Sequence, residues 1–341
     1  MFVRQRTAQQ EQQQEYPVPG QSSLAMNRSE ATRSGWQRAA IRHAFRIFLA
    51  IILVFYISFR GKSRASHASV TGSTRIVAIG DLHGDHKNAL VVFRLAGLVD
   101  AQGDWIAGST TLVQTGDFVD RGPDTIVLYQ WIKKLTEQAD KVGGKVIPLL
   151  GNHEVMNFMG DWRYVTEEDV ASFGGEEARR EAWSKEGWLG QYIRTWDLTT
   201  IVNNTVFLHG GLHPKWARRG IAALNNETHL ALNTMSNAEL RQLPLFHGDG
   251  PLWYRGYAQD PERIVCSLLE EALKTVNATR MVIGHTPQLD SGHILSRCNN
   301  RVHIIDVGIS AVYGGNHAAL EILGDRVTAI YDSHNVVIVD G

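Results

Sequence analysis

The chain reads Ile-Val-Ala-Ile-Gly-Asp-Leu-His-Gly at residues 76–84, and this stretch decides its fold class. Four apolar residues, three of them β-branched, predict a short strand that is buried on both faces. Asp81 and His83 follow directly, and both are residue types that bind metal ions. A helical pattern over residues 87–95 comes next. The stretch therefore predicts the beginning of a βαβ unit, with a polar corner at the end of its first strand.

The combination of a buried strand and a polar, glycine-containing corner occurs five times along the chain. The apolar runs cover residues 76–79, 111–113, 146–150, 206–208 and 281–283. The corners that follow them are Gly80-Asp81-Leu82-His83-Gly84, Gly116-Asp117-Phe118-Val119-Asp120-Arg121-Gly122, Gly151-Asn152-His153-Glu154, His209-Gly210-Gly211 and Gly284-His285-Thr286. One Gly-Asp corner is a common turn, but five in order are not explained as turns. Because the carboxyl ends of strands in such sheets share one crevice, we expect the corners to meet there.

Beyond His285 the sequence is rich in strand patterns. They cover residues 302–305, 318–323 and 327–331, and Gly324-Asp325 predicts a hairpin turn between the last two. The length of 341 residues and an apolar content of 43% allow one large domain with a terminal extension. We place this domain at residues 75–341. The formal net charge of −1 offers no basic field for nucleic acid.

The corners supply aspartate, histidine and asparagine side chains, a donor set that suits manganese, iron or zinc. A bridging carboxylate holds two such ions about 3.5–4 Å apart and lets them activate a water molecule. Arginines that accompany the corners match phosphate oxygens with two parallel hydrogen bonds. Phosphoryl transfer needs positioning and charge neutralisation above all. The sequence therefore predicts a two-metal phosphoesterase.

The five corners resemble those of the phosphoprotein phosphatase family within the calcineurin-like metallophosphoesterases. Residues 151–157, 160–165 and 305–310 resemble more narrowly the Shewanella-like, bacterial-type protein phosphatases. The resemblance covers residue 75 to the C-terminus. It implies an α/β (α+β) fold in which two mixed β-sheets pack as a sandwich flanked by helices.

The resemblance also implies the metal ligands. Asp81 and His83 resemble ligands of the first metal, and Asp117 resembles the carboxylate that bridges both. The second metal has three further candidate ligands, which are Asn152, His209 and His285. We expect two divalent ions, with manganese favoured and iron or zinc as alternatives.

The remaining site residues concern the substrate. His153 resembles the general acid that protonates the leaving oxygen, and Asp120 resembles the residue that orients its imidazole. Arg121 and Arg255 resemble phosphate clamps, although Arg255 lies in a weak motif and has a plain surface role as its alternative.

Several neighbouring residues have two readings. Asp85, Arg163 and Tyr164 either line the cleft or have surface roles. Residues 166–197 form either a lid or substrate-selecting insertion, or an ordinary helical cap. Residues 308–313 stand where eukaryotic phosphoprotein phosphatases carry a Ser-Ala-Pro-Asn-Tyr-type loop. The resemblance therefore implies an enzyme without toxin sensitivity and without eukaryotic-type regulatory subunits.

The expected reaction is hydrolysis of a phosphomonoester by direct attack of a hydroxide bound to two metals, since the motifs contain no obvious nucleophilic serine or cysteine. The expected substrate is a phosphoprotein or phosphopeptide, with serine/threonine or tyrosine specificity left open. One alternative is a small-molecule or dinucleotide polyphosphate hydrolase of the same fold. Another is a membrane-tethered phosphoprotein-binding module without catalysis.

The N-terminal region has a different composition. Residues 1–43 are rich in Gln, Arg and Ser and predict a disordered tail. The apolar residues 44–60 predict a transmembrane signal anchor, with an organelle-targeting segment and a buried core helix as alternatives. Residues 61–74 read as a linker. Basic residues are slightly denser before the anchor, which places the catalytic domain on the luminal, extracytosolic side of the membrane.

Two further features bear on the compartment. Asn203, Asn226 and Asn277 begin glycosylation acceptor triplets that matter only in a lumen. Cys266 and Cys298 form no metal-type pair, and we expect them to stay unpaired unless the domain is luminal.

Overall fold

The computed structural model describes residues 74–341. The predicted tail and anchor and all but the last residue of the linker lie outside these described residues. Between residues 74 and 341 no helix is both long and apolar enough to cross a membrane.

The first sheet has the strand order β11-β10-β9-β1-β2-β3. Its strands are β1 (Ile76–Ile79), β2 (Thr111–Gln114), β3 (Lys145–Pro148), β9 (Ala318–Leu323), β10 (Arg326–Tyr331) and β11 (Asn335–Val339). β1, β2 and β3 run parallel, whereas β9 pairs antiparallel with β1 and continues into the β9-β10-β11 meander. The predicted hairpin at Gly324-Asp325 is confirmed, and the sheet is mixed.

The second sheet has the order β4-β5-β6-β8-β7. Its strands are β4 (Thr199–Val202), β5 (Thr205–Leu208), β6 (Arg280–Ile283), β7 (Leu295–Arg297) and β8 (Val302–Ile304). β5, β6 and β8 run parallel, and β4 and β7 are antiparallel strands at its two edges. This sheet is mixed as well.

The two sheets share a core, which explains why the strands read as continuous apolar runs. Ile76 and Ala78 on β1 belong to the same buried cluster as Phe207 on β5 and Val282 on β6. Val77, the residue between Ile76 and Ala78, faces the opposite side and belongs to the larger cluster that includes the helices. Alternate residues of one strand are thus buried against the other sheet or against helices. The predicted sandwich flanked by helices is confirmed.

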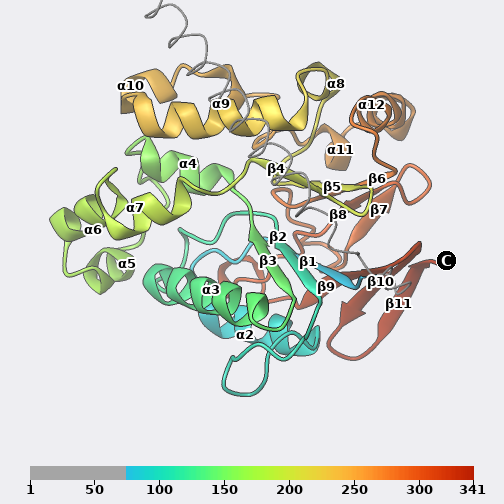
Figure 1. Ribbon diagram of the computed structural model, residues 1–341, viewed down its shortest axis with the longest axis horizontal. Coiled ribbons are helices and arrows are strands. Elements are labelled where there is room, and N and C mark those ends of the chain that lie inside the picture. Colours follow the sequence, from blue (N-terminus) through green and yellow to red (C-terminus); the bar gives the residue numbers. More distant parts are fainter. Residues whose placement is uncertain (1–73) are drawn as a thin grey trace, which may run out of the picture. The chain divides into compact units, whose positions relative to one another are not determined.

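Helices connect the strands and cover the sheets (Figure 1). They are α2 (His86–Leu95), α3 (Thr125–Asp140), α4 (Asn152–Phe158), α5 (Glu167–Ser172), α6 (Glu176–Trp183), α7 (Trp188–Ile193), α8 (Pro214–Ala217), α9 (Ile221–Thr234), α10 (Asn237–Leu240), α11 (Gly256–Gln259) and α12 (Glu262–Thr275), with short 3₁₀ turns η1 (Pro244–Phe246) and η2 (Ala311–Tyr313). α2 and α3 form the crossovers between the first three parallel strands, as the βαβ pattern predicts.

Residues 166–197 form α5, α6 and α7 and pack onto the domain as a helical cap. Trp183 and Trp196 are buried, and their rings lie 6.1 and 5.5 Å from the ring of Tyr129 on α3. None of the residues from 166 to 197 lines the metal pocket described below. Of the two readings of this segment, the packing favours the cap.

The two cysteines are paired, which is the outcome that the sequence left open for a luminal domain. Cys266 on α12 and Cys298, directly after β7, form a disulfide with their Cα atoms 5.2 Å apart. They are 32 residues apart in sequence, and the strands between them return the chain to the side of α12. Local sequence patterns carry no information about such a return.

Candidate two-metal active site

Backbone hydrogen bonds connect the first corner, after β1, to the second corner, after β2. The amides of Leu82 and His83 both donate to the carbonyl oxygen of Asp117, at 2.9 Å each. Gly84 and Gly122 lie so close that a Cβ atom on either would overlap the backbone of the other. Glycine at both positions therefore lets the loops after β1 and β2 come into contact.

Many site residues adopt left-handed backbone angles that non-glycine residues rarely use. The φ angles are 43° at His83, 58° at Asp117, 69° at Asp120, 71° at Arg121 and 69° at His285. Each such conformation costs on the order of 1–3 kcal/mol and persists only where surrounding contacts enforce it. The corners therefore store strain at the positions that carry the predicted chemistry.

A buried carboxylate enforces the corner at Asp117. Glu154 on α4 is fully buried and accepts hydrogen bonds from the amides of Asp117, Phe118 and Gly151 at 2.9, 2.9 and 2.8 Å. The hydroxyl of Tyr129 on α3 donates a further bond at 2.7 Å. Four donors from three segments thus converge on one side chain. Glu154 lies in the corner Gly151-Asn152-His153-Glu154, but no local pattern predicted this role for it.

Asp117 lies at the centre of the predicted ligands. Its Oδ2 atom is 3.7 Å from Nε2 of His83, 3.2 Å from Nε2 of His209 and 3.8 Å from Nε2 of His153. Asp81 completes this side, with a carboxylate oxygen 3.9 Å from the same nitrogen of His83. A carboxylate in this position can bridge two cations.

The second group of donors surrounds His209. Its Nε2 atom lies 2.8 Å from Oδ1 of Asn152 and 3.1 Å from Nδ1 of His285. Ring nitrogen Nδ1 of His209 faces the carbonyl oxygen of Thr115 at 2.8 Å, which leaves Nε2 for a ligand. The fold therefore brings together all the predicted metal ligands, from both sheets.

The charges of these groups fit divalent cations. Burial, with Asp306 and Asp117 nearby, raises the pKa of Asp81 well above its ordinary value. Burial also lowers the pKa of His83 to about 4 and that of His285 well below its ordinary range, so both favour the neutral form that binds metals. Nε2 of His285 is buried without a hydrogen-bond partner. Crowded carboxylates and neutral imidazoles match the needs of two metal ions.

The predicted acid and its orienting partner are in contact. Nδ1 of His153 lies 2.7 Å from Oδ2 of Asp120, and both side chains are buried. Burial lowers the pKa of His153, but the carboxylates of Asp117 and Asp120 outweigh burial and raise it above its ordinary value. The pair can therefore hold a proton for transfer.

The predicted phosphate clamps both line the pocket over the metal ligands, which has a volume of about 160 Å³. The Arg121 guanidinium lies 3.9 Å from the ring of Tyr164, which also lines the pocket. Arg255, the weakest sequence candidate, is held there because it donates to the carbonyl oxygen of His285 at 2.6 Å. Two guanidinium groups thus face the same small cavity.

Two of the residues with two predicted roles, Asp85 and Arg163, lie outside the metal pocket. Asp85 caps α2 by accepting from the amide of Asn88 at 3.0 Å, and it also accepts from the amide of Ala311 at 2.8 Å. Arg163 is exposed and pairs with Asp161 at 2.6 Å; it lines the larger groove described below and not the metal pocket.

Four residues that line the pocket had no predicted site role: Trp253, Pro287, Asp306 and Tyr313. Trp253 lies beside Arg255, and Asp306 and Tyr313 lie in residues 305–310 and 308–313, so the sequence carried a local signal for these three. Asp306 is buried, and burial raises its pKa to about 6.

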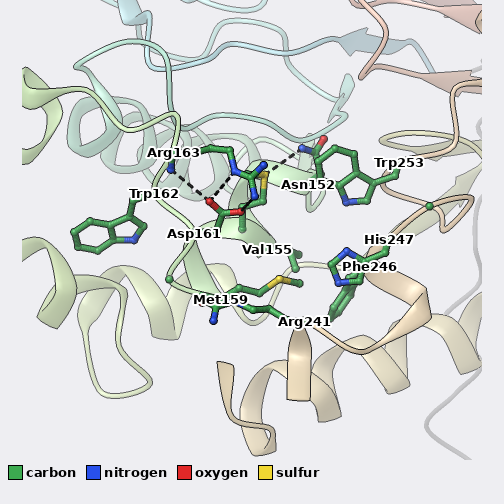
Figure 2. Close-up of a pocket in the computed structure, with 13 residues that line it drawn as sticks. Asn152, Val155, Met159, Asp161, Trp162, Arg163, Arg241, Phe246, His247 and Trp253 are labelled. Atoms are coloured by element: carbon green, nitrogen blue, oxygen red, sulfur yellow. Dashed lines mark hydrogen bonds and ion pairs between the residues drawn. The ribbon is translucent and has the colours of Figure 1, made fainter. Parts of the chain in front are cut away.

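A larger groove of about 630 Å³ adjoins the metal pocket and shares Asn152 and Trp253 with it. Figure 2 shows α4 and the loop after it on one side of the groove, and Phe246, His247 and Trp253 on the other. The groove contains apolar side chains as well as the basic groups of Arg163, Arg241 and His247, with Asp161 as its acidic member.

Comparison with known proteins agrees with this geometry. Residues 74–289, more than half of the chain, match the family model of the calcineurin-like phosphoesterases. The chain belongs to this family and is a metallophosphoesterase, a hydrolase.

Individual relatives include members of the Shewanella-like protein phosphatases. The chain is 31% identical to Shewanella-like protein phosphatase 2 of Arabidopsis thaliana, over 76% of this chain and 78% of the relative. It is 41% identical to an uncharacterised protein of Schizosaccharomyces pombe, over 78% and 82% of the two chains. The solved structure of a cold-active protein-tyrosine phosphatase from a psychrophilic Shewanella species matches with a TM-score of 0.69 and 27% identity, over 79% and 81% of the two chains.

We expect Glu154→Gln to destabilise the fold by about 3 kcal/mol, because the amide nitrogen of glutamine would face backbone N–H donors that now bond to a carboxylate. Tyr129→Phe, which removes a single donor to the same carboxylate, should cost only about 1 kcal/mol. Urea unfolding in the presence of a chelator measures both. Equal stability of the two variants would show that Glu154 does not organise the corner.

Proposed function

We propose that this chain is a protein phosphatase that removes phosphate from phosphotyrosine in acidic sequence contexts. The observation that carries the proposal is the continuity of the metal pocket with the groove. The pocket has room and charge for a phosphate group, and the groove beside it offers length, apolar surface and basic side chains for a polypeptide.

The chain's own residues supply the parts of a phosphomonoester hydrolysis. Arg121 and Arg255 would hold phosphate oxygens and orient the phosphorus atom for in-line attack. His153, held by Asp120, would give its proton to the leaving oxygen. Two divalent cations on the ligands around Asp117 would neutralise the phosphate charge and lower the pKa of a water molecule.

Aromatic side chains around the pocket support the choice of phosphotyrosine. The ring of Tyr164 lies 5.1 Å from that of His153, Tyr313 lies 5.1 Å from His83, and Trp253 lies 5.5 Å from His285. All three aromatic side chains line the pocket. Such a rim gives a phenol leaving group ring surfaces to pack against, and the Shewanella relative is described as a tyrosine phosphatase.

Charge in the groove supports an acidic peptide. Arg241 is exposed and donates to the carbonyl oxygen of Met159 on the groove wall, which fixes its position. Arg163 is partly neutralised by Asp161, whereas Arg241 forms no salt bridge with a carboxylate among the described residues. An acidic side chain next to the phosphorylated residue would therefore meet a positive charge that Asp161 offsets only at a distance, without a salt bridge.

Chelation should abolish hydrolysis of p-nitrophenyl phosphate by the full chain, and added Mn²⁺ should restore it. Asp117→Asn should remove turnover because both cations lose a shared ligand. His153→Asn should lower kcat/KM by about 10²–10⁴-fold because the leaving oxygen loses its proton donor. Circular dichroism checks that the variants stay folded. Near-normal activity of either variant would overturn the assigned roles.

The substrate class needs peptides and nucleotides side by side. We expect higher kcat/KM for an acidic phosphotyrosine peptide than for a neutral one, and Arg241→Gln should reduce that ratio about two- to five-fold, as an exposed charge pair allows. The matched control is Arg326→Gln on β10, which removes an exposed arginine outside the groove and should leave the ratio unchanged. Faster hydrolysis of phosphothreonine peptides or of dinucleotide polyphosphates would reject the proposed substrate.

We also infer that the catalytic domain lies in a non-cytosolic compartment, tethered by residues 44–60. The disulfide between Cys266 and Cys298 supports this, because structural disulfides persist mainly in oxidising compartments. Asn203, Asn226 and Asn277 are all exposed and accessible to a glycosyltransferase.

Expression of the full chain in a eukaryotic cell line tests the compartment. We expect both cysteines to resist alkylation in intact membranes and the domain to be protected from added protease. A glycosidase-sensitive mass shift that disappears in the variant with Asn203→Gln, Asn226→Gln and Asn277→Gln would identify a lumen of the secretory pathway. Protection without glycans would identify another organelle. Reduced cysteines together with protease access would refute the inference.

A further inference from the structure

A buried arginine of the helical cap reaches the residues that orient the candidate acid. Arg179 on α6 is fully buried. Its Nε donates to Asp169 on α5 at 2.8 Å, and its Nη1 donates to Oδ1 of Asn157 on α4 at 2.9 Å. Its third nitrogen, Nη2, lies 4.0 Å from Oδ1 of Asp120. The cap thus delivers a positive charge to the carboxylate behind His153.

Asn157 connects the arginine to the acid. Its Nδ2 donates to Oδ1 of Asp120 at 3.0 Å and to the carbonyl oxygen of His153 at 2.9 Å. Because Oδ1 of Asn157 accepts from Arg179, the amide has one favourable orientation, with its NH₂ group toward Asp120. The reversed amide would place donors against a guanidinium group.

This arrangement fixes the carboxylate of Asp120 in one plane. Its Oδ1 atom is held by Asn157, so Oδ2 is left facing Nδ1 of His153 at 2.7 Å. The imidazole is then held by one ring nitrogen while Nε2, 3.8 Å from Asp117, is presented to the metal pocket. Asp120 itself has a left-handed φ of 69° and needs such support.

Packing alone does not account for an arginine at this position. The guanidinium lies among the rings of Trp162, Phe173 and Trp183, at 4.8, 5.5 and 5.6 Å. An apolar side chain would fill such an aromatic cage without the cost of burying a charge, and buried ion pairs are weak contributors to stability. Their best-attested use is to specify one arrangement among several.

We propose that Arg179 is a positioning residue for phosphate hydrolysis, acting through Asn157 and Asp120 on His153. This rests on the proposed function, since it takes His153 as the proton donor to the leaving group. The helical cap would then help to position the candidate acid without contacting substrate or metal.

The test uses a series of leaving groups. A poor leaving group such as phenolate needs a proton at the transition state, whereas 2,4-dinitrophenolate does not. We expect Arg179→Met in the full chain to lower kcat/KM for phenyl phosphate by about 10²-fold or more, and for 2,4-dinitrophenyl phosphate by less than about 5-fold. Arg179→Lys keeps the charge without the planar fork. Its kcat/KM for phenyl phosphate should therefore lie between that of Arg179→Met and that of the unaltered enzyme.

The cap offers a matched control for the loss of a buried arginine. Arg194 is also buried, but it donates to the carbonyl oxygens of Leu232 and Ser184, at 3.0 and 2.8 Å, and does not touch the Asp120 network. Arg194→Met should therefore lower stability without changing the dependence on leaving group.

A double variant adds an independent check. Arg179→Met should add little to the defect of Asp120→Asn, because both act on the same imidazole.

The results distinguish failure of the positioning role of Arg179 from failure of the proposed phosphatase function. A uniform loss across leaving groups in Arg179→Met and Arg179→Lys, or the same profile in Arg194→Met, would overturn the positioning role. Absence of metal-restored hydrolysis of every aryl phosphate by the unaltered enzyme would instead reject the proposed function.

Discussion

The carboxylate of Glu154 is the interaction on which the site depends. It accepts hydrogen bonds from three backbone amides and one phenol hydroxyl. These bonds connect the ends of β2 and β3 and the beginning of α4 to α3. Asp117 has a left-handed backbone within this tie, so its side chain cannot follow the direction that an ordinary strand end would impose. The central carboxylate of the ligand set is placed by a residue that is itself no ligand.

The site lowers the free energy of unfolding, and the apolar burial in the surrounding sandwich offsets this loss. Buried carboxylates stand close together, the imidazoles of His83 and His285 are kept from protonation by burial, and several corners have strained backbones. Each of these features opposes folding. The strands that carry them are buried on both faces, between the sheets and beneath the helices, and this apolar burial supplies the opposing stability. Functional strain is thus confined to the strand ends, where the sheet is already rigid.

Around this centre the molecule has an inner and an outer zone. The inner zone consists of the corners, the two arginines and His153, and it suits any phosphomonoester. The outer zone consists of the groove with Arg241 and Trp253 and of the α5–α7 cap, whose Arg179 reaches inward to the Asp120 carboxylate. If the proposals made above hold, substrate choice and proton transfer depend on segments that lie outside the candidate metal-binding corners.

The sequence by itself determined the strand-and-corner pattern and the fold class, and it singled out the candidate metal ligands. These follow from local rules: a run such as residues 76–79 must be buried, and a glycine corner after it must expose its polar side chains. It also indicated Arg255, although only the fold shows that this arginine reaches the pocket. Tertiary structure alone decided the edge strands β4, β7 and β11, the cap on α2 by Asp85, the disulfide of Cys266 and Cys298, and the contact of Arg179 with Asp120. β4 and β7 lack a continuous apolar run, whereas β11 has one (NVVIV) but is largely exposed. The other contacts join residues whose approach depends on the whole chain path. Periodicity reports which face of a segment is buried, but not which distant side chain it is buried against.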